Sequence, residues 1–304
     1  MKVSVLLICY NQENYIKDAI ESILMQETDF EWELLIGDDS SLDGTAEQIE
    51  EAIQNNPSNC KVVTYFREKN IGASQNLFEL IKNAKGEYIT VLEGDDYWLD
   101  QKRLQTLADF LDDHSEYIGV SYKRERRRNG EFVKYDPEGG LVGKPFTLQD
   151  YFDGKRFSAM ACLFHNIYTK DYEGYEYLYT GARNACDQIM CYSILFAGDI
   201  FILNRFFGVY RIFSGGYCSQ QSQMRRINDY LVQNRRLLEY YGDQKAIQAE
   251  IVLFHSEAVK ILLKTEGMKS ARKYYKQIDK AEKKGVLKAT FKMLFRKIFR
   301  GRRK

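Results

Sequence analysis

Two pairs of adjacent aspartates, at positions 38–39 and 95–96, are the residues of this 304-residue chain whose spacing points most directly to chemistry. Each pair closely follows a short apolar and β-branched segment, residues 32–37 and 88–92, of the kind that forms a buried strand. Neighbouring carboxylates repel one another unless a divalent cation or a hydrogen-bond network lies between them. A single Asp-Asp pair could simply cap the next helix. Because the arrangement occurs twice, it favours a polar crevice.

The first hundred residues alternate between strand-like and helix-like segments. Strands are expected at residues 2–9, 32–37, 61–66 and 88–92, and amphipathic helices at residues 15–25, 46–53 and 75–84. The short connections between them predict an α/β architecture, a parallel sheet with right-handed crossovers. Ligands bind to such sheets at the carboxyl ends of the strands, so both acidic pairs are expected at one edge.

The following residues are expected to complete the same domain. We expect a helix at 102–112, a β-hairpin at 118–135 that turns at Asn129-Gly130, a buried strand at 157–164, a helix at 185–197 and a strand at 200–209. Asp187 lies at the start of the expected 185–197 helix, where it could act as the N-cap. Residues 123–128 are strongly basic, so they either protect an exposed edge strand or contact an acceptor that bears phosphate.

The C-terminal part of the chain has a helical period and an uneven charge. Three amphipathic helices are expected between residues 227 and 278, followed by a basic amphipathic helix at 286–299. Residues 283–304 include ten basic and no acidic residues, whereas the rest of the chain has about nine more acidic than basic side chains. This distribution predicts a helix on an anionic membrane surface; the alternative is a helix docked on the body. It does not favour a nucleic-acid partner.

The composition is that of a soluble globular protein, with 44% hydrophobic residues and a formal net charge of +1. Six scattered cysteines without a Cys-x-x-Cys pair predict buried free thiols in a reducing compartment, not a disulfide framework or a zinc site. No apolar run approaches 18 residues, and Met1 leads directly into a strand-like segment, so neither a membrane span nor a signal peptide is expected. We therefore expect a cytoplasmic protein that is peripheral on the cytoplasmic face of the membrane.

Five short motifs occur along the chain in a fixed order. They are Tyr10-Asn11 after the first strand, Asp-Asp-Ser-Ser-Leu-Asp-Gly-Thr at 38–45, Asn-Ile-Gly at 70–72, Gly-Glu-Tyr-Ile at 86–89 and Glu-Gly-Asp-Asp-Tyr-Trp at 93–98. Together they resemble the motifs of family 2 glycosyltransferases, nucleotide-sugar-dependent enzymes with the GT-A fold. The resemblance implies a Rossmann-like mixed sheet flanked by helices at 1–215, followed by a helical C-terminal region at 216–304.

The resemblance also implies roles for single residues. Asp39, with Asp38 beside it, would accept a hydrogen bond from the donor base, usually the uracil of UDP. Other carboxylates would touch the ribose, hold Mg²⁺ or Mn²⁺ against the diphosphate, and act as the base of an inverting transfer. The implied donor-binding residues are Asp38, Asp39, Asn70, Gly72, Glu93, Asp95 and Arg211, the implied metal ligands are Asp95 and Asp96, and the implied catalytic base is Asp187.

Two positions depart from the family pattern. Phe213 stands where close relatives often have a histidine that can ligate the metal, and Ile8-Cys9 removes a hydroxyl near the base pocket. Two further side chains have open roles. Arg211 could neutralise the diphosphate or form a structural ion pair, and Trp98 could stack on a sugar or pack in the core.

The leading hypothesis is an inverting, metal-dependent glycosyltransferase in surface polysaccharide synthesis. It would move a hexose or N-acetylhexosamine from a nucleotide sugar, expected to be UDP-linked, to a glycan or lipid-linked glycan acceptor. The alternative, motivated by Phe213, is a non-catalytic nucleotide-sugar-binding scaffold of a glycan-assembly complex. A nucleotidyltransferase is less favoured, because that related fold usually begins with a Gly-rich, basic phosphate loop, and residues 2–14 contain no glycine.

Overall fold

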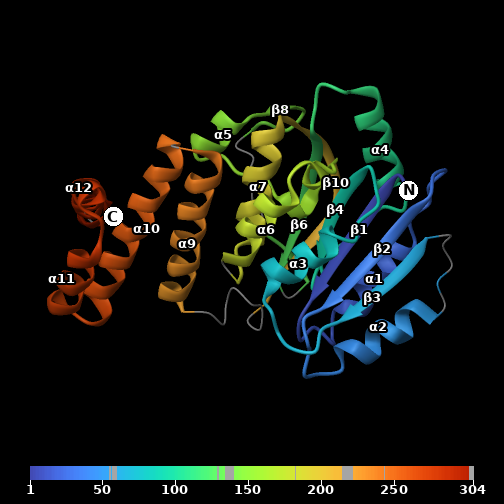
Figure 1. Cartoon of the computed structure of the whole chain (residues 1–304), viewed down its shortest axis with the longest axis horizontal. Helices are drawn as coiled ribbons and strands as arrows, with labels where there is room; N and C mark the ends of the chain where they lie inside the picture. Colours follow the sequence, from blue (N-terminus) through green and yellow to red (C-terminus); the bar gives the residue numbers. More distant parts are fainter. Residues whose placement is uncertain are drawn as a thin grey trace. The chain divides into compact units, whose positions relative to one another are not determined.

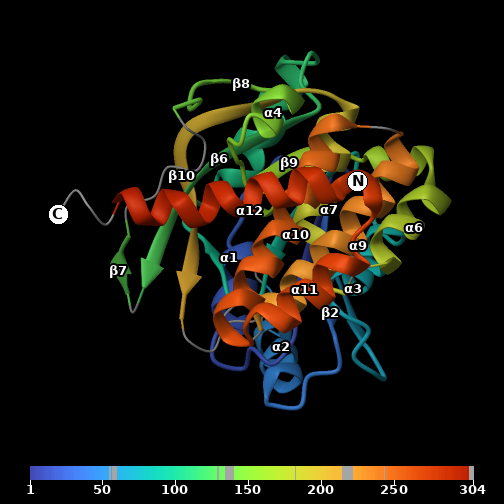
Figure 2. The same ribbon diagram turned by 90° about the vertical axis from the view of Figure 1, so that its left-hand side faces the viewer.

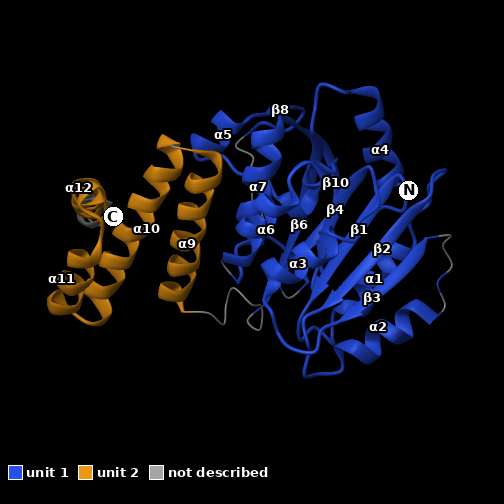
Figure 3. Ribbon diagram, in the orientation of Figure 1, with its two compact units in different colours: residues 1–216 blue, residues 217–304 orange. Residues whose placement is uncertain are grey.

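The computed structural model describes most of the chain in two compact units, Met1–Gly216 and Tyr217–Lys304 (Figure 3). The described residues are 1–54, 56, 60–128, 130–133, 140–181, 183–213, 222–242 and 244–300, with side chains placed up to residue 293. Several predicted features lie outside this set: Asn129 of the hairpin turn, the hairpin end at 134–135, Cys218, and the residues of the basic tail beyond 300.

The first unit begins with a parallel sheet whose strands are β1 (Val3–Cys9), β2 (Trp32–Asp38), β3 (Lys61–Phe66) and β4 (Tyr88–Glu93). Their spatial order is β3-β2-β1-β4, and all three pairings are parallel. The register places Cys9 opposite Asp38, and Ile8 opposite Glu93. The predicted parallel arrangement is therefore confirmed, and both acidic segments leave the sheet at the same edge.

The second half of the sheet is mixed. The short strand β9 (Cys162–His165) runs antiparallel between β4 and β6 (Gly119–Arg128), and β10 (Ile200–Ile212) is parallel to β6. Three small strands pair with these: β5 (Tyr97–Trp98) and β8 (Lys144–Phe146) with β10, and β7 (Glu131–Phe132) with β6. In Figure 2, β6 and β10 run side by side with β7 next to β6.

Two expectations for this half are refined by the structure. In the sheet order β6 lies between β9 and β10, but β9 pairs with it only as far as Ser121 and β7 only at Arg127 and Arg128, so among the described strands residues 123–125 pair with β10 alone and keep one open side. The expected strand at 157–164 is buried, but only its end is a strand. The 3₁₀ turn η1 (Ala159–Ala161) precedes β9, so the chain enters the sheet over four residues only.

Helices cover both faces of the sheet (Figure 1). The helices α1 (Ile16–Leu24) and α4 (Arg103–Asp113) share one apolar cluster with β1, β2 and β4, and α2 (Thr45–Gln54) adds Ile49 to it. The other face carries α3 (Ala73–Ile81), which packs against β1 and β2, together with α6 (Tyr172–Gly181) and α7 (Cys186–Ala197). The central strand β1 is buried at every residue, as its continuous apolar run predicts.

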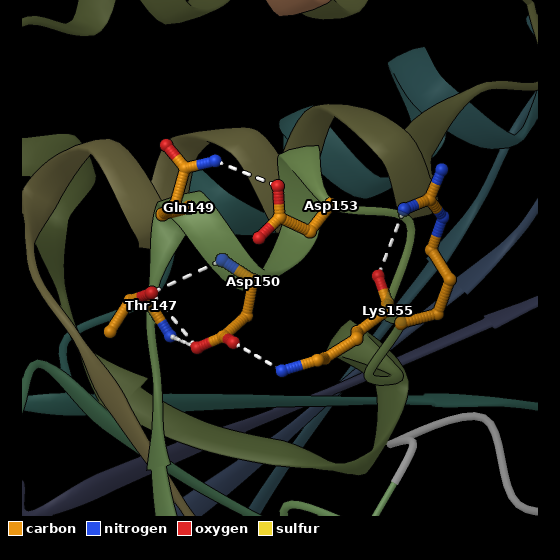
Figure 4. Close-up of polar contacts among 6 residues, drawn as sticks. Thr147, Gln149, Asp150, Asp153 and Lys155 are labelled. Atoms are coloured by element: carbon orange, nitrogen blue, oxygen red, sulfur yellow. Dashed lines mark hydrogen bonds and ion pairs between the residues drawn. The ribbon is translucent and has the colours of Figure 1, made fainter.

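The short helix α5 (Leu148–Phe152) precedes β9 and is fixed at its start by a reciprocal cap (Figure 4). The Asp150 N–H donates to the Thr147 hydroxyl at 3.1 Å, and the Thr147 N–H donates to the Asp150 carboxylate at 3.0 Å. Lys155 pairs with the same carboxylate at 2.7 Å. Such a capping box satisfies two N–H groups that a helix end otherwise leaves unpaired.

The second unit consists of the helices α9 (Gln223–Tyr241), α10 (Lys245–Thr265), α11 (Met268–Gln277) and α12 (Lys280–Arg300), with α10 in contact with each of the others. Figure 2 shows α12 as one long helix. Its Val286 is fully buried, whereas Leu287 is 50% and Phe291 52% exposed. No helix in the described part of the chain has the length and apolar character needed to cross a bilayer.

Candidate active site

The end of β2 and the turn that follows it hold two aspartates, Asp38 and Asp39, that are each only 3% exposed. The Asp38 carboxylate accepts hydrogen bonds from the backbone N–H of Ser41, at 3.2 Å, and from the Ser41 hydroxyl. The Asp39 carboxylate accepts the backbone N–H groups of Ile71, at 2.7 Å, and Gly72, at 2.8 Å, one on each oxygen. Burial raises the pKa of Asp39, and these two N–H bonds oppose the shift. Asp39 therefore fixes the turn that contains the predicted Asn-Ile-Gly motif.

That turn packs against the loop that leads into α7. Gly72 has φ +93°, and a Cβ at this position would lie 2.9 Å from the backbone oxygen of Arg183. The Ser74 N–H donates to the same oxygen at 3.0 Å, and the Ala185 N–H donates to the Ser74 hydroxyl at 3.0 Å. The Arg183 guanidinium donates to the Asn70 side chain. Only glycine fits here, because both the backbone conformation and the space exclude a side chain.

The turn after β4 is tied to the second half of the sheet. Asp96 is 1% exposed, and its two oxygens are engaged by Arg124 of β6, at 3.1 Å, and by the backbone N–H of Arg211 of β10, at 2.9 Å. The Arg211 guanidinium donates to the backbone oxygen of Asp95 at 3.1 Å. Burial raises the pKa of Asp96 to about 7, although Arg124 and the Arg211 N–H lower it. Asp96 thus joins β4, β6 and β10 at one point.

Glu93 and Asp95 lie beside Asp96 and share its electrostatic environment. Burial and the charges of Asp95 and Asp96 raise the pKa of Glu93 well above its usual range, and burial also raises the pKa of Asp95. Gly94, between them, allows this close packing, because a Cβ there would lie 2.4 Å from the Gln12 side-chain oxygen. A cluster of carboxylates whose pKa values rise together is stabilised by a bound cation.

Asp95 is a candidate ligand for a divalent cation. Its carboxylate receives no hydrogen bond or ion pair from another described side chain, whereas both oxygens of Asp96 are engaged as stated. Among the described residues, no group of three or more histidine, cysteine or acidic side chains is placed to hold a metal alone. A site of this kind fits Mg²⁺ or Mn²⁺ bound by one or two carboxylates, with the remaining ligands from substrate phosphate and water.

Asp187 lies in the first turn of α7, but it is not the N-cap. That position belongs to Ala185, so the N-cap interpretation of Asp187 is wrong. Asp187 is an exposed residue, and its carboxylate accepts the N–H of Gln188 at 2.8 Å. Desolvation of the carboxyl group by the protein around it raises the pKa of Asp187, and the Asp187 charge in turn raises the pKa of Glu93. The structure therefore brings Asp187 into the electrostatic environment of Glu93, the last residue of β4.

Arg211, Phe213 and Trp98, whose roles were left open by the sequence, each contact an aromatic ring or a guanidinium group. The Arg211 guanidinium lies 4.4 Å from the centre of the Tyr97 ring and pairs with Asp18, so it forms the structural ion pair that was one of its two predicted roles. The Phe213 ring packs 4.6 Å from that of Tyr15. Trp98 is buried in the core, with the Arg103 guanidinium 3.8 Å from its ring centre, which excludes stacking on a sugar in this arrangement.

Sequence reasoning did not foresee two arginines of the site. Arg124 belongs to the basic stretch of β6, and its partner Asp96 is 28 residues earlier in the chain. Arg183 braces the Asn70 turn from a loop far along the sequence. The high density of arginine in residues 123–128 was the available signal for Arg124; no pattern in the sequence pointed to Arg183.

The site thus gathers acidic residues at the carboxyl edge of a mixed sheet, as nucleotide-binding α/β folds do. The model of the family described as Glycosyl transferase family 2 matches residues 4–170, more than half of the chain. The chain belongs to glycosyl transferase family 2. The likeness inferred from the five motifs is therefore confirmed, and the match includes the turns after β1, β2 and β4.

Among curated relatives, this family 2 chain is 34% identical to the putative glycosyltransferase EpsE of Bacillus subtilis over 148 residues, which are 47% of this chain and 52% of EpsE. It is 32% identical to the putative teichuronic acid biosynthesis glycosyltransferase TuaG of the same organism over 113 residues, 37% of this chain and 43% of TuaG. An uncharacterized protein of Mycobacterium tuberculosis, Rv1520, is 38% identical over 114 residues, 38% of this chain and 32% of Rv1520. The matches span between a third and about half of these relatives.

Two solved structures show the fold. The 1–349 fragment of S. aureus TarS, in complex with UDP-GlcNAc, has a TM-score of 0.64 and 21% identity, covering 95% of this chain and 79% of TarS 1–349. The mannosyltransferase PcManGT from Pyrobaculum calidifontis, in complex with GDP-Man and Mn²⁺, has a TM-score of 0.55 and 15% identity, covering 97% of this chain and 88% of PcManGT. The predicted GT-A fold, a mixed α/β sheet flanked by helices with a helical C-terminal region, is confirmed.

Proposed function

We propose that this chain is an inverting glycosyltransferase that moves a hexose or N-acetylhexosamine from a nucleotide sugar to a glycan or lipid-linked glycan in surface polysaccharide synthesis. The observation that carries the proposal is that the charge of Asp187 raises the pKa of Glu93, which lies beside Asp95 and Asp96. We assign the exposed residue Asp187 to the acceptor side, and the other three carboxylates to the region that would bind the diphosphate. The relative TuaG, described as a putative teichuronic acid biosynthesis glycosyltransferase, supports the polysaccharide setting.

The donor is proposed to bind over the turns after β2 and β4, through Asp38, Asp39, Asn70, Gly72, Glu93 and Asp95. Complexes of TarS with UDP and with UDP-GlcNAc support a UDP-linked donor. Asp39 already accepts two backbone N–H groups, so its part is to hold the turn at 70–72 and to offer its remaining lone pairs to the base. Arg211, anchored by Asp18, adds positive charge near the diphosphate.

A divalent cation, Mn²⁺ or Mg²⁺, is proposed to bind at Asp95. The absence of any hydrogen bond or ion pair from another described side chain to the Asp95 carboxylate supports this choice, as does the Mn²⁺ complex of the mannosyltransferase PcManGT. When bound, such an ion stabilises the negative charge that accumulates on a departing diphosphate. Asp96, predicted as a second ligand, instead holds Arg124 in this structure and so positions a second cationic group at the same place.

The proposed base is Asp187. Its carboxylate removes the proton from the acceptor hydroxyl as that oxygen forms a bond to the anomeric carbon, and the bond from this carbon to the diphosphate oxygen breaks on the opposite side. The nucleoside diphosphate leaves with the electron pair, and the anomeric configuration inverts. The raised pKa of Asp187 makes it a stronger base than an ordinary aspartate.

A panel of nucleotide sugars tests this proposal. With Mn²⁺, the matching UDP-sugar at a hundredfold excess over its Kd is expected to raise the unfolding midpoint by about 5–10 °C through mass action. Without the cation the rise is smaller. Product formed with a glycan acceptor should have an inverted anomeric configuration by NMR. Donor binding without transfer or hydrolysis over many acceptors would instead support the scaffold alternative. That alternative is motivated by Phe213, which stands where relatives often have a histidine.

The basic end of the chain is proposed to place the site on the cytoplasmic face of the membrane. Leu287 and Phe291 are exposed on α12, one helical turn apart, next to Lys288 and Lys292. An apolar stripe flanked by lysines binds anionic lipid surfaces through both burial and charge. This arrangement supports a peripheral association and a lipid-linked acceptor.

Removing the exposed stripe should release the protein from membranes. The double variant Leu287→Ser/Phe291→Ser, like deletion of residues 286–304, is expected to lose most of its binding to vesicles that contain phosphatidylglycerol, measured by co-sedimentation. Binding by the unaltered chain should weaken as salt rises from 50 to 500 mM. Leu253→Ser, at a similarly exposed leucine of α10, is the matched control and should keep full binding. Equal binding by all variants would favour a helix docked on the body.

A further inference from the structure

The strand β6 carries six charged residues, five of them basic, past the point where its pairing with β9 ends at Ser121. Side chains of a strand alternate between its two faces. The register irregularities of the β6–β10 pair fall between Leu203 and Gly208 of β10, so the alternation along β6 is regular. One face therefore carries Arg124, Arg126 and Arg128, which we name the arginine row, and the other carries Lys123, Glu125 and Arg127.

Contacts of the side chains support this division. The Tyr210 ring of β10 lies between two members of the arginine row, 4.9 Å from the guanidinium carbon of Arg124 and 5.1 Å from that of Arg126. On the opposite face, Arg127 is neutralised by Glu125 at 2.6 Å. The two faces of the same strand thus differ in net charge as well as in direction.

The arginine row begins at the active site and leads away from it. Arg124 contacts Asp96, and its charge lowers the pKa values of Glu93 and Asp95. Arg126 and Arg128 follow at about 7 Å intervals. Arg128 is exposed, and no ion pair joins it to Glu131, its neighbour on β7. The row therefore extends roughly 13 Å from a site that is itself acidic.

An acidic site repels an anionic substrate, and a row of arginines beside it opposes that repulsion. The donor diphosphate is proposed to bind at the turns after β2 and β4, whereas Arg126 and Arg128 lie farther along β6. We propose that the arginine row binds the acceptor and that this acceptor is an anionic glycan carrying repeated carboxylate or phosphate groups. This inference rests on the proposed transfer function and specifies its acceptor. Guanidinium groups bind both kinds of anion in a bidentate manner.

The test compares acceptor binding by the double variant Arg126→Gln/Arg128→Gln with binding by Lys123→Gln/Arg127→Gln. The two variants lose the same charge from opposite faces of one strand. Probes of equal length are an oligogalacturonate, a phosphorylated maltooligosaccharide and the neutral maltooligosaccharide, measured by titration calorimetry at several salt concentrations. We expect the arginine-row variant to lose roughly tenfold in affinity per arginine for an anionic probe, while the control loses less than twofold. Which anionic probe binds more tightly identifies carboxylate or phosphate as the recognised group.

The outcomes separate the two proposals. Selective loss in the arginine-row variant supports the inference, even if no donor is turned over; in that case only the transfer function fails. Equal losses in both variants, or equal affinity of the unaltered chain for neutral and anionic probes, would overturn it. Loss of binding to anionic vesicles with unchanged glycan binding would overturn it too, and would assign the row to the membrane. If the double variant does not fold, Arg128→Gln alone is used, because this side chain is exposed.

Discussion

Replacement of Asp187 by asparagine is expected to lower kcat for sugar transfer by a factor of about 10²–10⁴, the usual contribution of a positioned general base. Asparagine keeps the shape of the side chain, and its amide oxygen can still accept the N–H of Gln188. It cannot take a proton from the acceptor hydroxyl. The loss should therefore appear in kcat with saturating acceptor, measured as release of nucleoside diphosphate.

The raised pKa of Asp187 adds a second measurement. A base acts in its ionised form, so the rate of the unaltered chain should fall with decreasing pH, at a midpoint above the ordinary range of an aspartate. The control is Asp153→Asn, an exposed aspartate at the end of α5, which should keep both the rate and the pH profile. Donor affinity should be unchanged in both variants. A rate for Asp187→Asn within a few-fold of the unaltered chain would remove Asp187 from the chemistry.

The parallel half of the sheet follows from the sequence because its signals are local. Continuous apolar runs, such as residues 3–9, alternate with amphipathic helices, and right-handed crossovers leave little freedom in how they assemble. The second half depends on pairing between strands that are far apart in the sequence. The four-residue strand β9 inserts between β4 and β6. A buried strand was expected at residues 157–164, but no local pattern shows with which strands it pairs. This insertion places β6 inside the sheet.

The acidic residues of the site were equally visible in the sequence, since Asp38, Asp39, Asp95 and Asp96 follow two strands. Their partners were not. Whether a carboxylate binds a ligand or a backbone N–H depends on contacts between segments far apart, such as Asp39 with Gly72 or Asp96 with Arg124. One local signal was available but not used: Thr147 and Asp150 have the spacing of a capping box, which forms at the start of α5.

The acidic cluster is expected to make the ligand-free protein less stable as the pH rises. The pKa of Asp96 is about 7 in the folded chain, against an ordinary value near 3.8, so between pH 4 and 7 the folded state binds more protons than the unfolded state. The free energy of unfolding therefore decreases with increasing pH across this window, by an amount on the order of 2–4 kcal/mol for Asp96. Glu93 and Asp95, whose pKa values are also raised, contribute with the same sign.

The variant Asp96→Asn should reduce this pH dependence, because its side chain does not ionise. Urea unfolding at pH 5 and pH 8 measures the difference: the unaltered chain should lose more stability between the two than the variant. Asp150→Asn is the control, because the lowered pKa of Asp150 confines its effect to more acidic solutions, where stability is lost as pH falls. An equal pH dependence of the free energy of unfolding in the unaltered chain and in Asp96→Asn would show that the charge of Asp96 does not destabilise the fold.

The same variant is expected to lose activity while it gains stability at pH 8. Asparagine cannot form the ion pair with Arg124, so the guanidinium is no longer fixed beside Asp95, and transfer should fall by roughly ten- to a hundredfold through loss of the charge-assisted contact. Asp96 would then lower the stability of the folded chain and still be needed for the reaction. Such a trade-off between stability and activity is common in binding sites. Unchanged transfer together with higher stability would mean that Asp96 has no role in positioning Arg124 for the chemistry.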